Sequence, residues 1–409
     1  MNRTGGPERV AAGEAVCPAG RRAWTPPGTL AGRGPRGLGP ARTGRWPLSP
    51  TASPPSLSLA RTSRPRPGPT EAVTNVTMAN SNDKGTAPDL AEHAGYLIEV
   101  AGRAPSVHNT QPWRFKVGGQ AIELYADTGR QLLEDPAGRE MLISCGAALY
   151  GLRLGIRSLG YRPEVELLPG PALLARVRTG PPAPMTPDER KMLQAVPRRH
   201  THRGPFEPGP LPAGLLARLQ DDVAAEGATL SVVDTEPARR KLTAILAGWS
   251  RVQDLHPASS ARMQSRADTE RWTREAGSRA RDGVPAHSFP AAAGREAGSL
   301  PRRDFDLDRG WGLLPSGGPP APVTALLVTS GDHREEWLRA GQGLQRLLLR
   351  AASHWVFASL QTQPMQMTSV RALIRSGLEL SGSPLMLLQL GRARTTHPTA
   401  RRPAAELTR

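Results

Sequence analysis

The sequence predicts an α+β protein made of two related halves fused in one chain, each with an antiparallel or mixed sheet flanked by helices. Helical periodicity and short β-rich runs alternate from residue 84 onward. The second half repeats part of the element order of the first. We therefore expect a disordered tail over 1–80, a first half over 84–185 and a second half over 186–409.

The first 77 residues differ in composition from the rest of the chain. They contain 11 Arg and 3 acidic residues, so they carry about +8 of the net charge of +17. Runs of Pro, Gly, Ser and Thr fill the same segment, which buries too little apolar surface to fold. Ordinary composition begins at Met78, which predicts that translation starts there. A protein beginning at Met78 should then keep the folding and activity of the full chain.

Composition also restricts the partners and the compartment. The arginines of the tail are scattered among prolines and form no single basic face, so we expect no nucleic-acid partner. No apolar run reaches the length of a membrane span, which predicts that the protein has no membrane partner. Cys17 and Cys145 provide neither a disulfide framework nor a CxxC metal pattern. We expect a cytoplasmic protein.

The elements of the first half follow from its periodicities. Residues 87–101 have apolar side chains at helical spacing, with Asp89 as the candidate N-cap. The later patterns predict the two strands of a hairpin, a long helix and a further strand, over Phe115–Val117, Ala121–Ala126, about 136–160 and Pro163–Leu168.

The long helix has a counterpart 195 positions later in the chain. A β-rich run precedes each copy, and a strand is expected after each, over 163–168 and 383–391. Apolar matches alone occur between any two amphipathic helices, but the shared order of strand, helix and strand indicates a duplication. The shift superimposes Glu140 on Glu335, Gly146 on Gly341, Leu149 on Leu344, Leu152 on Leu347, Leu154 on Leu349 and Ser158 on Ser353.

Two regions lie between the copies. Residues 186–250 have the pattern of a helix, a strand and a helix. Residues 265–320 are rich in Arg, Gly, Pro and acidic residues and have little periodicity. A segment of this length inside a compact domain is usually a lid, a binding loop or a disordered insert.

Three motifs were weighed as catalytic or metal sites. The GxGxxG pattern at 32–37 has no strand before it and no helix after it, so it does not predict a dinucleotide site. His200 and His202 have no Cys or Asp nearby, which favours surface or ligand-contacting histidines over metal ligands. Ser106 and His108 lack an orienting carboxylate, so the sequence predicts no catalytic nucleophile.

The strongest candidates for a binding site are the segments APSVHNTQPWRF (104–115) and RRHTHRGPF (198–206). The first is rich in side chains that donate or accept hydrogen bonds. In the second, Arg199, Thr201 and Arg203 place two guanidinium groups and a hydroxyl close together, which suits a bidentate phosphate site. A solvated basic turn is the alternative interpretation of this second segment.

Together the two segments resemble the nitroreductase superfamily, and most closely its Acg-type branch from actinobacteria. The family's R-R-[ST]-x-R element, which normally precedes the APS loop, is matched only later in this chain by Arg199, Thr201 and Arg203, with His200 where arginine is usual. Similarity extends over most of 84–407. The family's APSxxNxQPW element is matched by Ala104, Pro105, Ser106, Asn109, Gln111, Pro112 and Trp113.

The resemblance implies an FMN-binding oxidoreductase that passes two electrons from NADH or NADPH to a small acceptor such as a nitroaromatic or a quinone. The flavin would carry out the chemistry, so no catalytic side chain is assigned. The two halves would build the FMN site within a monomer or a homodimer. The implied cofactor contacts are Pro105, Ser106, Asn109 and Gln111 at the ring and ribityl chain, and Arg199, Thr201 and Arg203 at the phosphate.

The resemblance also leaves a second function open. In Acg-type proteins a region similar to 265–320 covers the flavin as a lid, so a flavin-storing stress-response protein without efficient turnover is the alternative. A sealing lid would favour storage, and an open groove would favour the enzyme. Gln366 stands where the branch commonly has Glu, and His354-Trp355 replaces a small segment, so substrate access is expected to differ.

Overall fold

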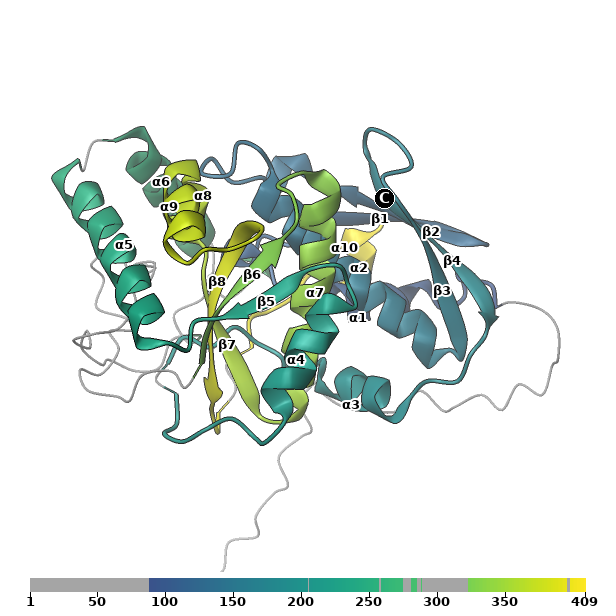
Figure 1. Ribbon diagram of the computed structural model, residues 1–409. Coiled ribbons are helices and arrows are strands. Elements are labelled where there is room, and N and C mark those ends of the chain that lie inside the picture. Colours follow the sequence, from purple (N-terminus) through teal and green to yellow (C-terminus); the bar gives the residue numbers. More distant parts are fainter. Residues whose placement is uncertain are drawn as a thin grey trace, which may run out of the picture. The chain divides into compact units, whose positions relative to one another are not determined.

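The computed structural model describes residues 88–204, 206–256, 259–274, 281–284, 288, 323–395 and 398–409. The predicted tail, the GxGxxG pattern and most of the 265–320 insert lie outside these residues. The described residues belong to one compact unit, Asn80–Arg409. In this unit two four-stranded antiparallel sheets pack with helices (Figure 1). The fold is therefore of the predicted α+β class.

The first sheet has the strand order β1-β2-β4-β3. The expected hairpin is present, with Trp113 of β1 opposite Ala126 of β2. β4 was missing from the predicted elements, because Arg, Gly and Pro interrupt its apolar pattern. The four strands are β1 (Trp113–Gly118), β2 (Ala121–Ala126), β3 (Tyr161–Leu167) and β4 (Leu173–Pro182).

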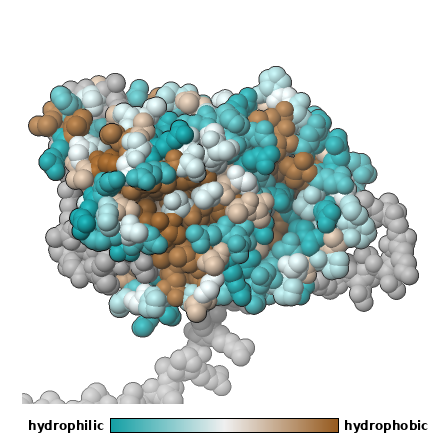
Figure 2. All heavy atoms as spheres, in the orientation of Figure 1, coloured by the Kyte–Doolittle hydropathy of each residue, from teal (hydrophilic) through white to brown (hydrophobic). Residues whose placement is uncertain are grey.

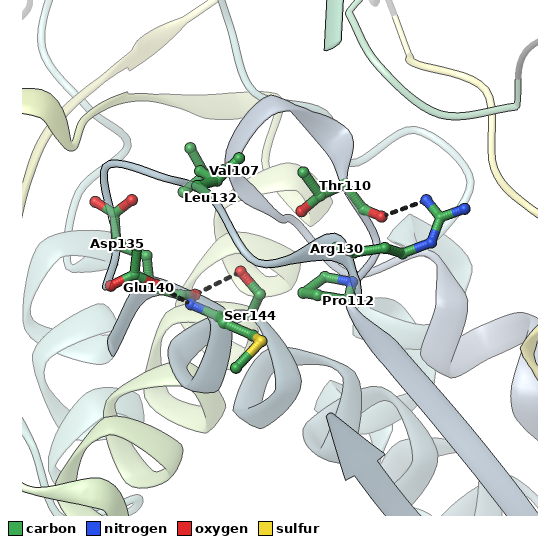
Figure 3. Close-up of a pocket in the computed structure, with 9 residues that line it drawn as sticks. Val107, Thr110, Pro112, Arg130, Leu132, Asp135, Glu140 and Ser144 are labelled. Carbon is green, nitrogen blue, oxygen red and sulfur yellow. Dashed lines mark hydrogen bonds between the residues drawn. The ribbon is translucent and has the colours of Figure 1, made fainter. Parts of the chain in front are cut away.

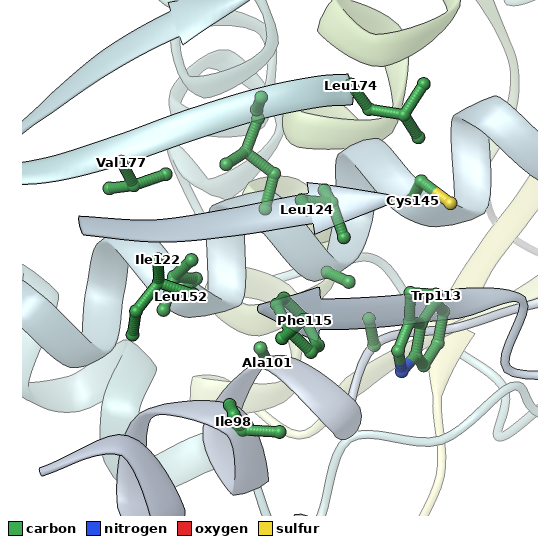
Figure 4. Packing of buried hydrophobic residues seen from close by; sticks show 14 of the residues in the cluster. Ile98, Ala101, Trp113, Phe115, Ile122, Leu124, Cys145, Leu152, Leu174 and Val177 are labelled. Atoms are coloured by element: carbon green, nitrogen blue, oxygen red, sulfur yellow. The ribbon is translucent and has the colours of Figure 1, made fainter. Parts of the chain in front are cut away.

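Helices α1 (Ala94–Gly102) and α2 (Arg139–Ser158) cover one face of this sheet. Alternate residues of β1 point inward, so Trp113 and Phe115 are fully buried while Lys116 is exposed. In Figure 4 both aromatic rings project from β1, and Phe115 lies next to Ala101 of α1. Burial of large side chains of this kind contributes about 1.5–3 kcal/mol each.

The helix α1 begins later than its periodicity predicts. Residues 90–93 form turns, and the helix starts at Ala94. The carboxylate of Asp89 accepts a hydrogen bond from the Ala91 amide at 2.8 Å, so it caps a turn and not the helix. The amide of Leu90 donates to the Gly119 carbonyl in the β1–β2 turn, which ties this residue to the hairpin.

The second sheet has the strand order β5-β6-β8-β7, the same arrangement as the first. α7 (Arg334–Ser353) connects β6 to β7 as α2 connects β2 to β3. This equivalence supports the duplication. The strand that directly follows α7 is β7, however, and not 383–391 as expected. The second sheet comprises β5 (Thr229–Val232), β6 (Val323–Thr329), β7 (Val356–Gln361) and β8 (Ser383–Arg392).

Helices cover both faces of the second sheet. α7 and α4 (Leu215–Ala224) pack on one face, and α5 (Glu236–Leu255) and α9 (Thr368–Gly377) pack on the other. The region 186–250 contains one more helix than predicted, since α3 (Pro187–Ala195) precedes α4. Figure 2 shows hydrophobic residues at the surface near α5 and α6 (Ser260–Arg274), where Leu255 is 75% exposed.

The helices α2 and α7 cross at the centre, between the two sheets (Figure 1). The crossing depends on the two glycines that the 195-residue shift aligns. A Cβ atom on Gly146 would overlap the Leu338 carbonyl oxygen, and one on Gly341 would overlap the Ile143 carbonyl oxygen. Neither glycine has a positive φ, so close backbone contact is what requires glycine here.

The end of the chain returns to the first half. α10 (Ala404–Leu407) packs against α1, and Thr408 forms a parallel bridge with Phe115 at the edge of β1. The amide of Arg409 donates to the Phe115 carbonyl at 2.7 Å. The described helices include none whose length and apolar character would let it cross a membrane.

Candidate functional site

The loop between α1 and β1 contains three left-handed residues that are not glycine. φ is 50° for His108, 56° for Asn109 and 50° for Gln111. Such conformations cost on the order of 1–3 kcal/mol each and persist only where surrounding contacts impose them. One such contact is local, since the Ser106 hydroxyl accepts a hydrogen bond from the Gln111 amide at 2.9 Å. We call residues 104–111 the APS loop.

The side-chain amides of Asn109 and Gln111 are occupied by other parts of the chain. Asn109 Nδ2 donates to the carbonyls of Gly283 and Ala400, each at 3.0 Å. Gln111 Nε2 donates to the Arg281 carbonyl at 2.8 Å, and its Oε1 accepts from the Arg402 amide. Both side chains therefore hold the insert and the C-terminal segment against the APS loop.

The second candidate segment, around 199–203, runs along the edge strand β7. Thr201 forms a parallel bridge with Ala358. Alternate side chains of an extended segment point to opposite sides. His200 and His202 lie on one side, with the His200 ring centroid 4.5 Å from that of Phe357 and the His202 centroid 4.7 Å from Phe206.

The histidines of this segment are buried in the core. Burial is the largest cause that lowers the pKa of His200, to about 3, and nearby cationic groups add to it. His200 is therefore neutral at physiological pH. Across the described ranges no group of three or more His, Cys, Asp or Glu residues is arranged to hold a metal ion.

The arginines of the same segment approach the APS loop. Arg199 Nε donates to the Arg103 carbonyl at 3.2 Å. From the other end of the chain, Arg401 donates through one terminal nitrogen to the Ala104 carbonyl at 3.2 Å. The guanidinium groups of Arg199 and Arg401 are thus anchored on neighbouring backbone carbonyls at the start of this loop.

Four guanidinium groups influence one another here, and we call them the arginine cluster: Arg103, Arg199, Arg203 and Arg401. Burial lowers the pKa of Arg199 to about 10, and the charges of Arg203 and Arg103 lower it further. Burial also lowers the pKa of Arg203 to about 10. For Arg401, burial and the other three arginines hold the pKa well below its usual value. Burial is the first cause of each of these three shifts, and each shift opposes the charged form of the guanidinium group.

Two atoms of the arginine cluster have unused hydrogen-bonding capacity. One terminal nitrogen of Arg199 and the Nε of Arg401 are buried and have no hydrogen-bond partner within the described part of the chain. Arg199 is 4% exposed. Buried donors are nearly always satisfied in proteins, and buried cations need an anion nearby. These atoms are suited to bind a phosphate or a similar anion.

The structure brings the two predicted segments together but does not give all of their residues the same role. Pro105 is buried in the loop wall, and Arg199 and Arg203 join the arginine cluster, whereas Thr201 pairs with β7. Sequence reasoning did not select Arg103 or Arg401. Arg103 directly precedes the APS loop, but no local pattern in the sequence marked it or Arg401 as part of a binding site.

A small cavity lies beside the APS loop, lined among others by Val107, Thr110, Asp135, Glu140 and Ser144 (Figure 3). The Glu140 carboxylate accepts a hydrogen bond from the Gln366 amide at 3.1 Å, which links α2 to the short helix α8 (Gln363–Gln366). Gln366, the departure from the family pattern, thus contacts the first turn of α2.

Asp135 is a buried carboxyl in this cavity, and burial raises its pKa to about 6. Because the folded-state pKa lies above the ordinary value of 3.8, the folded state binds the proton more tightly than the unfolded state. Deprotonation of Asp135 therefore lowers the free energy of unfolding as the pH rises from about 4 to about 6.

We expect Asp135→Asn to remove this pH dependence. Asparagine keeps the acceptor for the Met141 amide, which lies 3.0 Å from the Asp135 carboxylate, but carries no charge. Relative to wild type, the variant should gain up to about 3 kcal/mol of unfolding free energy between about pH 4 and pH 7. Urea unfolding across this range measures the difference, and a difference that does not change with pH would contradict the assignment.

The described part of the 265–320 insert packs on the APS loop. Arg130 donates to the Thr110 carbonyl at 2.9 Å and to the Asp282 carboxylate at 2.7 Å. The Glu134 amide donates to the carboxylate of Asp268, a buried residue of α6. α6 and residues 281–284 therefore cover the APS loop.

His354 and Trp355 lie at the turn between α7 and β7, where the Trp355 ring is next to Arg198.

The chain is similar in sequence to proteins that are named as nitroreductases. A Mycobacterium tuberculosis protein provisionally named NAD(P)H nitroreductase Rv3131 is 32% identical over 332 residues, which cover 78% of this chain and 92% of the relative. The provisionally named NAD(P)H nitroreductase acg of the same organism is 28% identical over 305 residues, covering 72% of this chain and 88% of acg. No family model matches the chain.

Solved structures with partial similarity include two nitroreductases. The FMN-dependent nitroreductase NfnB from Mycobacterium smegmatis, solved with NADPH, is 17% identical with a TM-score of 0.33, covering 53% of this chain and 97% of NfnB. A provisionally named nitroreductase from Anabaena variabilis is 12% identical with a TM-score of 0.44, covering 76% of this chain and 90% of that protein. By its sequence relatives, which it matches over nearly their whole length, the chain belongs to the nitroreductase superfamily and to its Acg-type branch.

Proposed function

We propose that the protein is an FMN-dependent oxidoreductase that takes two electrons from NADH or NADPH and passes them to a small acceptor such as a nitroaromatic or a quinone. The arginine cluster beside the APS loop is the observation that carries this proposal. It brings four guanidinium groups together, with buried donor atoms on Arg199 and Arg401 that have no partner among the described residues, and FMN ends in a dianionic phosphate. Membership in the nitroreductase superfamily supports the same cofactor.

The residues of the arginine cluster fit this phosphate. Arg199 is fixed at the Arg103 carbonyl and Arg401 at the Ala104 carbonyl, so both guanidinium groups are oriented before a ligand arrives. Pre-oriented guanidinium donors bind phosphate more strongly because less side-chain freedom is lost. Arg203 adds a third positive charge, and Thr201 is proposed to supply a hydroxyl.

The APS loop would form the wall beside the ring and the ribityl chain. Pro105 would contribute shape, and Ser106 a polar group next to the left-handed backbone. We propose that Asn109 and Gln111 act mainly by fixing this wall, since their amides hold the Gly283 and Arg281 carbonyls. Bound FMN would supply the two-electron chemistry. The chain's own residues would hold the cofactor, orient it and exclude water.

A direct test uses the purified full-length protein. We expect a yellow protein, or one that retains yellow FMN after incubation and desalting, whose visible absorbance bleaches with NADPH or NADH under anaerobic conditions. Return of the colour on addition of a nitroaromatic or a quinone would identify the acceptor class. A protein that remains colourless after incubation with FMN would refute the proposal.

A second candidate function is flavin storage without efficient turnover, in a cytoplasmic stress response. The contacts of residues 281–284 with the APS loop favour it, because a covered loop restricts access by nicotinamide. In that case dithionite would bleach the protein, but neither NADPH nor NADH would. The same experiment therefore distinguishes the two functions.

Gel filtration with light scattering would decide between a monomer with an internal pseudo-dimer and a homodimer.

A further inference from the structure

The Asn109 side chain connects the arginine cluster to the insert. Its Oδ1 accepts a hydrogen bond from Arg401 at 2.8 Å, while its Nδ2 donates to the Gly283 carbonyl at 3.0 Å. The residue is 3% exposed and has a left-handed backbone. One buried amide therefore bonds both to a member of the cluster and to residues 281–284, which we call the strap.

The position of Arg401 depends on the charge around it. Arg103, Arg199 and Arg203 all repel its guanidinium group. Hydrogen bonds to the Ala104 carbonyl, to the Asn109 amide oxygen and to the neighbouring Thr399 and Ala400 hold it in place, but its Nε has no partner within the described residues. A phosphate group bound among the four arginines would cancel the repulsion and keep Arg401 in contact with Asn109.

We propose that phosphate binding in the arginine cluster and docking of the strap on the APS loop are thermodynamically coupled, and that the path Arg401–Asn109–Gly283 carries the coupling. The proposal rests on the proposed function, since FMN would provide the phosphate. An anion that stabilises Arg401 also stabilises the oriented Asn109 amide, and with it the bond to Gly283. By reciprocity, a docked strap then raises the affinity for the anion.

Other contacts hold the strap independently of the arginine cluster. Gln111 binds the Arg281 carbonyl, Arg130 binds the Asp282 carboxylate, and the Val284 amide donates to the Trp272 carbonyl. The strap should therefore remain partly docked without an anion. We expect an increase in its protection of roughly 5- to 50-fold when the anion binds, within the usual range of coupling between sites.

Hydrogen exchange of the strap, followed by mass spectrometry on the full-length protein, tests the coupling. The probes are inorganic phosphate, FMN and riboflavin, which has the ring system of FMN but no phosphate. Inorganic phosphate and FMN should slow exchange in residues 281–284, and riboflavin should slow it much less. Unchanged exchange in the presence of bound FMN would overturn the coupling while leaving the proposed function intact.

Two matched variants separate the coupling from simple loosening of the strap. Asn109→Gly and Gln111→Gly each keep a left-handed backbone available and each remove one side chain that holds the strap. Of these two side chains, only that of Asn109 bonds to Arg401. We expect Asn109→Gly to abolish the phosphate-dependent protection, and Gln111→Gly to speed exchange with and without phosphate while keeping the ratio between the two states.

A further variant covers the case in which Asn109→Gly fails to fold. Asn109→Asp preserves the shape and the acceptor for Arg401 but loses the donor to Gly283, so it should also lose the coupling. Retention of the wild-type phosphate effect in either folded Asn109 variant would refute the assigned path. If FMN does not bind to any of the proteins, the proposed function fails. The response of the strap to inorganic phosphate then still decides the coupling.

Discussion

Replacement of both Arg199 and Arg203 by alanine should release FMN from the protein. A hydrogen bond to a charged group contributes about 1.5–3 kcal/mol, so loss of two arginines predicts a dissociation constant roughly 10²–10⁴-fold higher. Fluorescence titration of the apoprotein with FMN measures this change. The pKa of each arginine is lowered by burial, so we expect the variant to remain folded.

The control for this prediction removes equal charge elsewhere. Arg240 and Arg251 are exposed on α5, and alanine at both positions should leave FMN affinity within about twofold of wild type, because exposed charges act weakly at a distance in salt. Riboflavin provides a second control, since its affinity should be nearly the same in wild type and in the Arg199/Arg203 variant. If the Arg199/Arg203 variant still bound FMN stoichiometrically, the phosphate site would not be at these two arginines.

Gly146→Ala should strongly destabilise the protein. Its Cβ would overlap the Leu338 carbonyl oxygen on α7, a backbone atom that cannot move without separating the two central helices. Overpacking alone costs about 1–3 kcal/mol, and separation of a buried helix pair adds lost apolar contacts. We expect a loss of more than about 4 kcal/mol of unfolding free energy, or an insoluble product.

Gly248→Ala is the matched control for Gly146→Ala. Gly248 lies within the helix α5, and a Cβ there would meet no atom within 4 Å. Alanine should stabilise the protein by up to about 1 kcal/mol through its helix propensity. Thermal unfolding of the two variants side by side compares the same chemical change in two settings. Equal stability would mean that α2 and α7 are not in close backbone contact.

The aligned glycines also show how much of the fold the sequence carries. The 195-residue shift predicts two related helices, and the structure places Gly146 and Gly341 against each other's helix at the centre of the molecule. The shift does not reveal that contact, because a repeat contains no information about which copies pack together. β7 was also missed, because its residues VFASLQ do not alternate regularly between apolar and polar side chains and two helices separate it from β8.

The sequence predicted the two main segments of the candidate site but not all of its residues. The pairing of the APS loop with Arg199 follows from family motifs located about ninety residues apart, and the structure brings these segments into contact. Arg401 was not selected, because nothing in the local sequence indicates that the end of the chain returns to β1. Asn109 and Gln111 were expected to contact the flavin, which stays a prediction. Folding brings the Gly283 and Arg281 carbonyls to their side-chain nitrogens, and no local pattern indicates these partners.

The sequence by itself determined the α+β class, the duplication and the chemical types of the binding segments, because periodicity, repetition and residue chemistry are local properties. The tertiary structure decided which guanidinium groups lie together and which groups bond to the Asn109 and Gln111 amides. Those outcomes depend on contacts between residues as distant as Asn109 and Arg401. Burial then fixes their energetic effect, since charges and donors interact strongly only where water is excluded.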